Sequence, residues 1–404
     1  MDSKYKRNEV FTNRQLFFTY MAQTSDAPIG LEMQQAEGIY IIDTNGKKYI
    51  DGIAGFSVNN IGHSHPAVVK AVQDQVAQFM HLIVYGEFIQ SPQVSFSKLL
   101  TDHLPANLNC VYFTNSGAEA VEGAMKLAKR VTNRTNIIAF KNAYHGSTQG
   151  ALSIMGDEYW RNAYRPLLPG ITHADYGNYS VINLINTQTA CIIMEVVQAE
   201  AGIKPADKEW LQAVRNKCTE TGTLLVFDEI QSGFGRTGSL WAFEQYGIEP
   251  DILLLGKALG GGMPLGAFIA SNERMKTLTD NPVLGHITTF GGHPVSCTAG
   301  KAALKVLLQN NWIDSIKDKE NLILQRLQHP LIKAVHHCGL WVALEFETFE
   351  INKAIIHNCI QKGLITDWFL FAPTCLRIAP PLTITIEELH LLCDIVMESL
   401  EEYQ

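Results

Sequence analysis

Short apolar runs alternate with longer amphipathic stretches through the middle of the chain. The runs are apolar at nearly every position, a pattern typical of strands that are covered on both faces. They occupy residues 110–114, 137–140, 190–194, 223–227, 252–255 and 266–270. Most gaps between them are long enough for a crossover helix, although the last gap is shorter. The pattern therefore predicts an α/β layer with a mainly parallel central sheet.

The two ends of the chain have a different pattern. Two apolar segments separated by Thr44-Asn45-Gly46 predict a β-hairpin over residues 38–50. Helical periodicity begins near residue 300, and short strands are expected at 340–346 and 376–379 before a final helix from 386 to about 403. The predicted organisation is an N-terminal segment (1–60), a large domain (61–295) and a smaller α+β C-terminal domain (296–404).

Composition and charge exclude several classes of protein. Of 404 residues, 46% are hydrophobic, which fits a packed globular protein rather than a disordered one. The net charge of −8 and the lack of a basic run argue against nucleic acid as a partner. No apolar stretch approaches the length of a membrane-spanning helix, and residues 1–10 do not resemble a secretory signal. The eight cysteines are scattered without a C-x-x-C pair, which favours reduced thiols in a cytoplasmic protein.

Three segments carry candidate chemistry. The first, Thr114-Asn115-Ser116-Gly117-Ala118, follows a predicted strand and opens a helix. A small, glycine-containing turn at a helix N-terminus presents backbone N–H groups and a partial positive charge, which can hold a phosphate. By itself this segment is more simply explained as an ordinary helix cap.

The second segment is a buried strand that ends in Asp228-Glu229 and continues into a glycine-rich loop. Residues just past the carboxyl end of such a strand face the ligand crevice of an α/β sheet. A carboxylate there can hold a cationic ring nitrogen, but Asp228 as a helix cap with Glu229 on the surface is an equally good interpretation. For Glu229 we favour a structural role over that of a general base.

The third segment is an apolar strand followed by Gly256-Lys257 and three glycines. A lysine removed from water loses its proton more readily and becomes a nucleophile toward carbonyl groups. The glycines let the backbone approach a ligand closely. The alternative is a lysine whose ammonium group extends to solvent from the strand end.

These segments, taken in order, resemble the class III aminotransferases, which are fold type I pyridoxal-phosphate enzymes. The resemblance runs from about residue 25 to the C-terminus, and in length and body it is nearest to the acetylornithine/ornithine aminotransferase branch. Five linked motifs in family order make chance agreement negligible. They lie at residues 116–120, 144–146, 228–238, 256–262 and 289–292.

The resemblance implies pyridoxal 5'-phosphate as cofactor and a role for each matching residue. Lys257 would bind the cofactor covalently and move a proton, and Asp228 would pair with its ring nitrogen. The other implied cofactor contacts are stacking by Tyr144, a hydrogen bond from Gln231 to the ring oxygen, His145 beside the ring, phosphate binding by Ser116, Gly117 and Ala118, and Thr289 reaching the cofactor phosphate of the neighbouring subunit. The family builds its sites across a two-fold interface, so a homodimer is expected.

The resemblance also assigns substrate contacts. Arg377 would bind a substrate carboxylate, and Glu200 would pair with Arg377 when no carboxylate is present. One pocket would then alternate between an amine donor and an oxo acid, expected to be 2-oxoglutarate. Thr288 belongs to the same implied pocket. Ser147 is a departure, because acetylornithine, ornithine and 4-aminobutyrate enzymes usually carry an arginine there; residues 144–148 instead resemble the ω-amino acid:pyruvate transaminases.

Other interpretations compete with this one. A metal at His63 and His65 is disfavoured because no third ligand follows at suitable spacing, and the same holds for His286, His293 and the pair His336-His337. An aminomutase or racemase on the same site would need no added oxo acid. A non-catalytic cofactor-binding regulator usually has an N-terminal helix-turn-helix domain, for which the stretch before the family match is too short.

Overall fold

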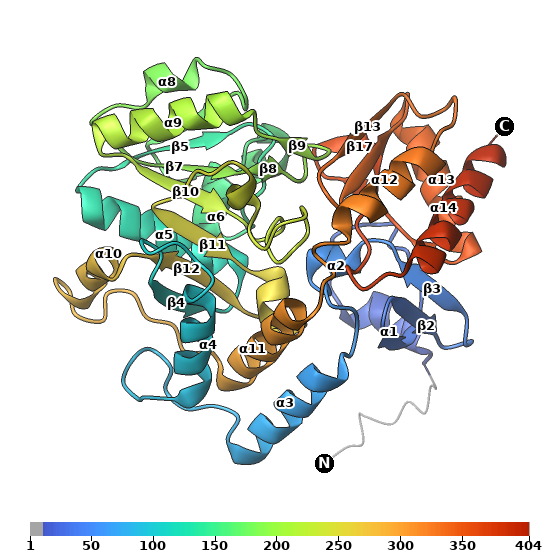
Figure 1. Cartoon of the computed structure of the whole chain (residues 1–404), viewed down its shortest axis with the longest axis horizontal. Helices are drawn as coiled ribbons and strands as arrows, with labels where there is room; N and C mark the ends of the chain where they lie inside the picture. Colours follow the sequence, from blue (N-terminus) through green and yellow to red (C-terminus); the bar gives the residue numbers. More distant parts are fainter. Residues whose placement is uncertain (1–10, 404) are drawn as a thin grey trace, which may run out of the picture.

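A seven-stranded sheet forms the centre of the larger part of the molecule (Figure 1). The computed structural model describes residues 11–403, so residues 1–10, on which the expectation about a secretory signal rests, lie outside the described range. The strand order is β4-β12-β11-β10-β7-β5-β6, and β12 runs antiparallel to both of its neighbours while the pairings among the rest of the sheet are parallel. The prediction of a mainly parallel sheet is confirmed. The strands span Cys110–Thr114 (β4), Asn136–Phe140 (β5), Ile171–Ala174 (β6), Thr189–Glu195 (β7), Leu224–Asp228 (β10), Ile252–Leu255 (β11) and Gly266–Ala270 (β12).

Each apolar run that predicted a strand forms one, because the sheet is covered on both faces. Along β7, Ile192 and Met194 belong to one hydrophobic core, whereas Cys191 and Ile193 belong to the core on the opposite face. Successive side chains of a strand point to opposite faces, so burial on both sides requires apolar residues at every position. Strand β6 was not predicted. It is an edge strand that pairs with β5 alone and is only partly buried, which weakens its apolar signal.

Helices cover the sheet on both faces. Helix α5 buries Val121, Met125 and neighbouring residues in the core on one face, and α9 buries Trp210 and Val214 in the core on the other. Within residues 11–403, no helix is long and apolar enough to cross a membrane. The α-helices span Asn13–Tyr20 (α1), Ala54–Ser57 (α2), Pro66–Gln78 (α3), Ser91–Thr101 (α4), Gly117–Thr132 (α5), Gln149–Ile154 (α6), Glu158–Arg161 (α7), Val181–Leu184 (α8), Lys208–Thr221 (α9), Asn272–Lys276 (α10), Pro294–Gln309 (α11), Ile316–Arg326 (α12), Phe349–Lys362 (α13) and Ile386–Glu401 (α14). Short 3₁₀ turns span Asn162–Tyr164 (η1), Ala242–Gln245 (η2), Lys257–Gly260 (η3) and Thr277–Thr279 (η4).

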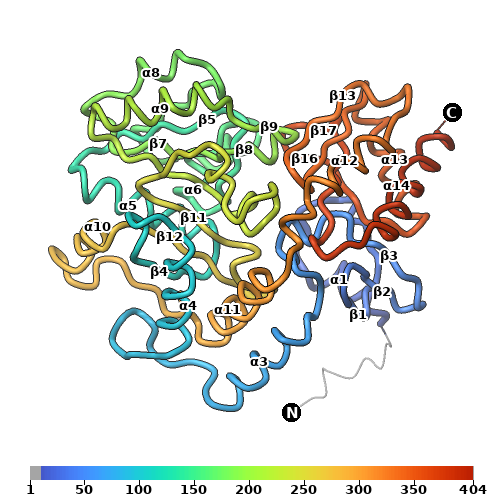
Figure 2. The backbone as a smooth tube through the Cα atoms, in the orientation of Figure 1, coloured from blue at the N-terminus to red at the C-terminus, as the bar shows by residue number. Residues whose placement is uncertain are grey.

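The N-terminal strand segment, residues 33–51, lies beside the C-terminal part of the chain (Figure 2). Strand β15, from the C-terminal part, pairs in parallel with β3, so that Leu364 lies opposite Ile50. The predicted hairpin is confirmed as the antiparallel pair β2–β3. The division into segments 1–60, 61–295 and 296–404 stays a prediction. The remaining strands are Met33–Glu37 (β1), Tyr40–Asp43 (β2), Lys48–Asp51 (β3), Val197–Gln198 (β8), Lys204–Pro205 (β9), Ala334–His337 (β13), Val342–Glu345 (β14), Leu364–Ile365 (β15), Trp368–Phe369 (β16) and Ala372–Ile378 (β17).

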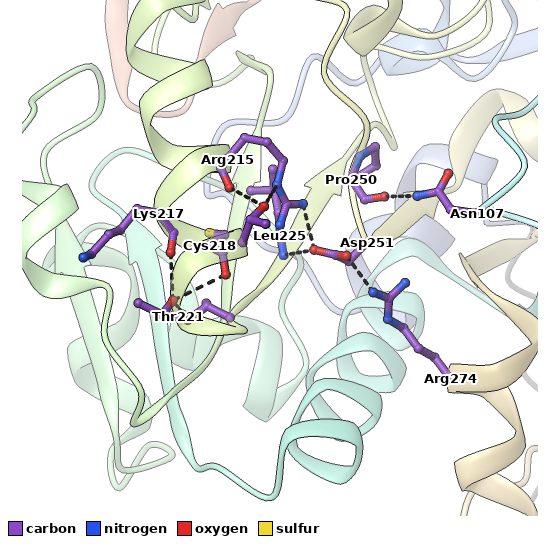
Figure 3. Close-up of polar contacts among 11 residues, drawn as sticks. Asn107, Arg215, Lys217, Cys218, Thr221, Leu225, Pro250, Asp251 and Arg274 are labelled. Atoms are coloured by element: carbon purple, nitrogen blue, oxygen red, sulfur yellow. Dashed lines mark hydrogen bonds and ion pairs between the residues drawn. The ribbon is translucent and has the colours of Figure 1, made fainter.

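An ionic cluster fixes the amino ends of two central strands (Figure 3). Asp251, just before β11, pairs with Arg215 of α9 and with Arg274 of α10, each at 2.8 Å. Its carboxylate also accepts a hydrogen bond of 2.9 Å from the backbone N–H of Leu225 in β10. The cluster thus holds two helices to the end of the sheet that lies opposite the carboxyl ends of β10 and β11.

Arg236 joins the glycine-rich loop after β10 to both ends of the chain. Its side chain is fully buried and donates to the carbonyl oxygens of Leu340 and Pro380 at 2.8 Å and to the Asn60 side-chain oxygen at 2.7 Å. Burial lowers the pKa of the Arg236 guanidinium to about 9. Because a buried cation needs its partners, these three contacts hold the loop to residue 60 and to the segment around residues 340–380.

We expect Arg236→Ala to destabilise the protein strongly. The change leaves three buried acceptors without donors, each costing about 1–3 kcal/mol. The midpoint of thermal unfolding should fall by several degrees, which calorimetry can measure. Lys70→Ala, which breaks an exposed pair with Asp74, is the matched control and should leave the midpoint nearly unchanged. Equal midpoints for the two variants would contradict this account of Arg236.

Candidate active site

Side chains from several parts of the sequence meet at one edge of the large sheet. Strands β4, β5, β7, β10 and β11 point the same way, so their carboxyl ends lie together. A cavity of about 250 Å³ lies at this edge. Its walls include ten of the residues predicted from the sequence, namely Ser116, Gly117, Ala118, Tyr144, His145, Ser147, Glu200, Asp228, Gln231 and Lys257.

Asp228 is held as a buried carboxylate. It ends strand β10, and one of its oxygens lies 2.7 Å from Nδ1 of His145. The other oxygen accepts the backbone N–H of Ile230 at 3.0 Å. Although burial of the imidazole opposes protonation, the hydrogen bond to Asp228 raises the pKa of His145. This contact holds the Asp228 carboxylate in place at the cavity, where it can face a cationic partner.

Lys257 lies in the turn that follows β11. Its Nζ donates to the side-chain oxygen of Gln231 at 2.9 Å. Burial lowers the pKa of the Lys257 ammonium, which favours the neutral amine that attacks carbonyl groups. The nitrogen of the Gln231 amide and the Ser232 hydroxyl are buried without a hydrogen-bond partner among the described residues. Polar groups in this position fit a cavity that holds a polar ligand.

Helix α5 begins at the cavity. Ser116 caps it by accepting the backbone N–H of Glu119 at 3.2 Å. The N-terminus of this 16-residue helix directs backbone N–H groups and the positive end of its dipole toward the cavity lined by Gly117 and Ala118. This end of the cavity can bind an anionic group such as a phosphate.

A second, larger cavity of about 740 Å³ adjoins the first. Tyr144, Ser147, Glu200 and Lys257 line both cavities. The walls of the larger one are otherwise mostly apolar and aromatic, formed by Phe56, Leu152, Met155, Trp160, Tyr164 and Leu370, with Thr24 and Gln149. Two connected cavities can hold a cofactor in the inner one and a substrate in the outer one.

Glu200 and Arg377 form a buried ion pair beside these cavities. The two terminal nitrogens of Arg377 donate to the two Glu200 oxygens at 3.0 and 2.9 Å, in the fork arrangement by which arginine binds carboxylates. The pair with Arg377 lowers the pKa of Glu200 despite its burial. Glu200 thus occupies both terminal nitrogens of Arg377.

Four residues considered from the sequence line neither cavity, namely Arg377, Thr288, Thr289 and Glu229. The Thr288 hydroxyl accepts the Asn115 side-chain N–H at 3.1 Å, and Thr289 is exposed; neither lines either cavity. Both oxygens of Glu229 accept backbone N–H groups, from Ala242 and Phe243, at 2.7 Å. This agrees with the structural interpretation of Glu229, whose pKa burial raises to about 8.

Four of the histidines considered as metal ligands have other partners. Nε2 of His63 lies 2.8 Å from Asp51, and Nδ1 of His65 accepts the backbone N–H of Ala67 in the first turn of α3. His336 and His337 contact Glu345 and Glu320 in the C-terminal part.

The sequence interpretation missed Glu195 as a cavity residue. Glu195 ends strand β7, lines the inner cavity and accepts the backbone N–H of Ala199 at 2.9 Å. Burial raises its pKa to about 8. Its place at the carboxyl end of an apolar strand is the same signal that singled out Asp228, and it was available in the sequence.

Comparison with known proteins agrees with this geometry. The family model described as aminotransferase class-III matches residues 20–400. The chain is 36% identical to acetylornithine aminotransferases of Bacillus anthracis (93% of this chain, 94% of the relative) and Methanocaldococcus jannaschii (91% and 93%). The solved structure of ornithine aminotransferase from Toxoplasma gondii ME49 is similar over 98% of this chain and 97% of its own, at 27% identity and a TM-score of 0.89. These relatives favour a transaminase over an aminomutase, a racemase or a regulator, and the chain belongs to the class III aminotransferases, as a pyridoxal-phosphate-dependent transaminase.

Proposed function

We propose that this enzyme transfers the terminal (ω) amino group of an amino acid, such as acetylornithine, ornithine or another ω-amino acid, to 2-oxoglutarate by a ping-pong cycle. The observation that carries the proposal is the shared wall of the two cavities, where Lys257 and Glu200 lie together and Glu200 occupies the fork of Arg377. Alternating amine and oxo-acid substrates require a reactive amine, here Lys257, beside a carboxylate-binding site, here Arg377, that its internal partner Glu200 can vacate. A panel of amines and ω-amino acids, assayed with 2-oxoglutarate and with pyruvate, tests it.

The inner cavity suits pyridoxal phosphate. When bound, this cofactor withdraws electrons from the substrate carbon and so stabilises negative charge there. We assign the phosphate to the N-terminus of α5, at Ser116, Gly117 and Ala118. Lys257 is assigned as the covalent attachment point and as the group that moves the substrate proton.

The remaining cofactor contacts follow from the same cavity. Asp228, backed by His145, is assigned to the protonated ring nitrogen. Tyr144 is assigned to the ring face and Gln231 to the ring oxygen. The exposed Thr289 is proposed to reach the cofactor phosphate of a neighbouring subunit, with Thr288 near the substrate.

Arg377 is assigned to the substrate carboxylate in each half-reaction whose substrate carries one. An incoming carboxylate would replace Glu200 on the two terminal nitrogens of Arg377. A donor that lacks this carboxylate leaves the pair intact. One site can thus accept both kinds of molecule, because its charge remains balanced in either case.

A homodimer in the cytoplasm completes the proposal. Two segments near the site expose large apolar side chains, including Phe88 and Ile89 on one and Val283 and Phe290 on the other. The ring of His81 lies 4.9 Å from that of Phe290, so the two segments form one surface. An apolar surface of this kind is suited to a second copy of the chain.

The first prediction about the proposed function concerns Lys257. Reduction of the holoenzyme with borohydride should fix a pyridoxyl group on Lys257, which peptide mass spectrometry can locate. Lys257→Ala should lose the visible absorption band of the bound cofactor, whereas Lys276→Ala, in the remote helix α10, should keep it. A label on any other lysine would show that the attachment site is wrong.

The second prediction concerns Asp228. We expect Asp228→Asn to retain cofactor while kcat falls on the order of 10²-fold or more, because a carboxylate at the ring nitrogen stabilises charge that develops in the transition state. KM should rise much less. Asp175→Asn, which breaks an exposed pair with Lys141, provides the control. Near-normal kcat in Asp228→Asn would mean that the ring nitrogen has another partner.

The third prediction concerns the donor. Ser147 supplies no charge to a distal carboxylate, and Lys257 is the basic residue that lines the outer cavity. An arginine fork contributes roughly 1.5–3 kcal/mol, so without it selectivity should fall by about one to two decades. We expect ω-amino acids and simple terminal amines to be used within about a hundredfold of ornithine-type donors, as measured by kcat/KM.

Ser147→Arg should then shift preference toward N-acetylornithine or 4-aminobutyrate, whereas the uncharged Ser147→Gln should not. If the wild-type enzyme already prefers N-acetylornithine by about three decades, another residue supplies the charge. Arg14 is a poor candidate within one subunit, because it donates to the Gly30 carbonyl and lines a separate groove along α1.

A further inference from the structure

Arg377 has a second acidic partner besides Glu200. Its Nε lies 3.0 Å from Oδ1 of Asp367. The N–H is not aligned for a linear hydrogen bond, and neither atom has another hydrogen-bond partner among the described residues, so the contact is an ion pair. Burial raises the pKa of the Asp367 carboxyl to about 6, so the group is ionised at pH 8. The buried guanidinium is therefore shared by two carboxylates.

Asp367 and Arg377 belong to the same backbone ladder. Asp367 directly precedes β16, which pairs with the strand β17 that carries Arg377. The Arg377 N–H donates to the Asp367 carbonyl at 2.9 Å, and the Thr366 hydroxyl donates to the Arg377 carbonyl at 2.6 Å. The relative position of these two charged residues is set by one sheet.

Glu200 is placed differently. It lies in the turn between β8 and β9, after the strand β7 of the large sheet. It lines both cavities, so a substrate can compete for its position, whereas Asp367 lines neither. The Glu200 carboxylate also accepts the backbone N–H of Leu370 at 2.9 Å, so a carboxylate that replaces Glu200 gains this donor as well as the arginine fork.

Aromatic rings restrict the guanidinium further. Its central carbon lies 4.2 Å from the ring centre of Phe369 and 5.2 Å from that of Phe56. Rings this close to the guanidinium limit its tilt. Rotation within its own plane is opposed by the ion pair at Nε, which leaves the two terminal nitrogens directed at Glu200.

We infer that Asp367 is a positioning residue: it keeps Arg377 paired and directed toward the outer cavity while Glu200 is exchanged for a substrate carboxylate. This inference rests on the proposed exchange at Arg377. If Arg377 lost Glu200 and had no second acidic partner, only the Trp368 carbonyl oxygen, 3.2 Å from a terminal nitrogen, would remain as an acceptor. The charge of the buried guanidinium would then be unpaired, which is costly. Asp367 removes that cost because it stays when Glu200 leaves.

The two half-reactions of the holoenzyme separate this role from a general structural one. In stopped-flow experiments at pH 8, Asp367→Asn should raise the apparent Kd of the pyridoxamine form for 2-oxoglutarate about tenfold or more, the usual size for loss of one partner of a buried charge. The half-reaction with n-butylamine, which has no carboxylate, should stay within about twofold of wild type. Asp394→Asn, the same change on the exposed face of α14, should alter neither.

A charge-preserving variant gives the second measurement. Asp367→Glu should keep the affinity for 2-oxoglutarate within about threefold of wild type, and it tests the proposal even if Asp367→Asn does not fold. An unchanged Kd in Asp367→Asn, equal damage to both half-reactions, or the same loss in Asp367→Glu as in Asp367→Asn would each overturn it. If wild type transfers no amino group from any donor, the proposed function itself fails.

Discussion

The parallel arrangement of the large sheet is the constraint on which the site depends. Strands that run the same way bring their carboxyl ends to one edge, and the residues that follow them meet there whatever their distance in sequence. Asp228 at the end of β10, Lys257 after β11 and Gly117 after β4 are brought together in this way. Their apolar strands are buried on both faces, so the edge that carries the polar groups is rigid.

Buried charge is the second constraint, because each buried ion needs a partner that remains in place. Asp228 is matched by His145, and Arg236 by carbonyl and amide oxygens from both ends of the chain. Arg377 differs, since it has one acidic partner on its own sheet and another that lines the cavities. Fixed partners suit charged groups that stabilise the fold. One fixed partner and one exchangeable partner suit a charged group that is proposed to change its ligand.

The sequence predicted those parts of the fold and the site that depend on local pattern. Continuous apolar runs indicated the buried strands, and Asp228 and Lys257 were identified because each follows such a run. Edge strand β6 gave too weak an apolar signal. Asp367 and Phe56 could not be found, because their contacts with Arg377 are created by tertiary packing and have no fixed spacing in the sequence. Thr289 is exposed, and its assignment depends on a neighbouring subunit that a single chain does not contain.

Under the proposed function, recognition at the two ends of the substrate depends on different physical interactions. At one end, Glu200 occupies the two terminal nitrogens of Arg377. Only another carboxylate can replace Glu200 there without leaving the buried guanidinium charge unpaired. At the other end, the cavity wall is formed largely by apolar side chains such as Trp160, Leu152 and Met155. Such a wall binds apolar parts of a substrate but discriminates weakly between substrates of similar size. Strict recognition therefore resides where charge is buried, and tolerance resides where the wall is apolar. In the proposed ping-pong cycle this division would allow one oxo acid to be selected while the amine donor varies.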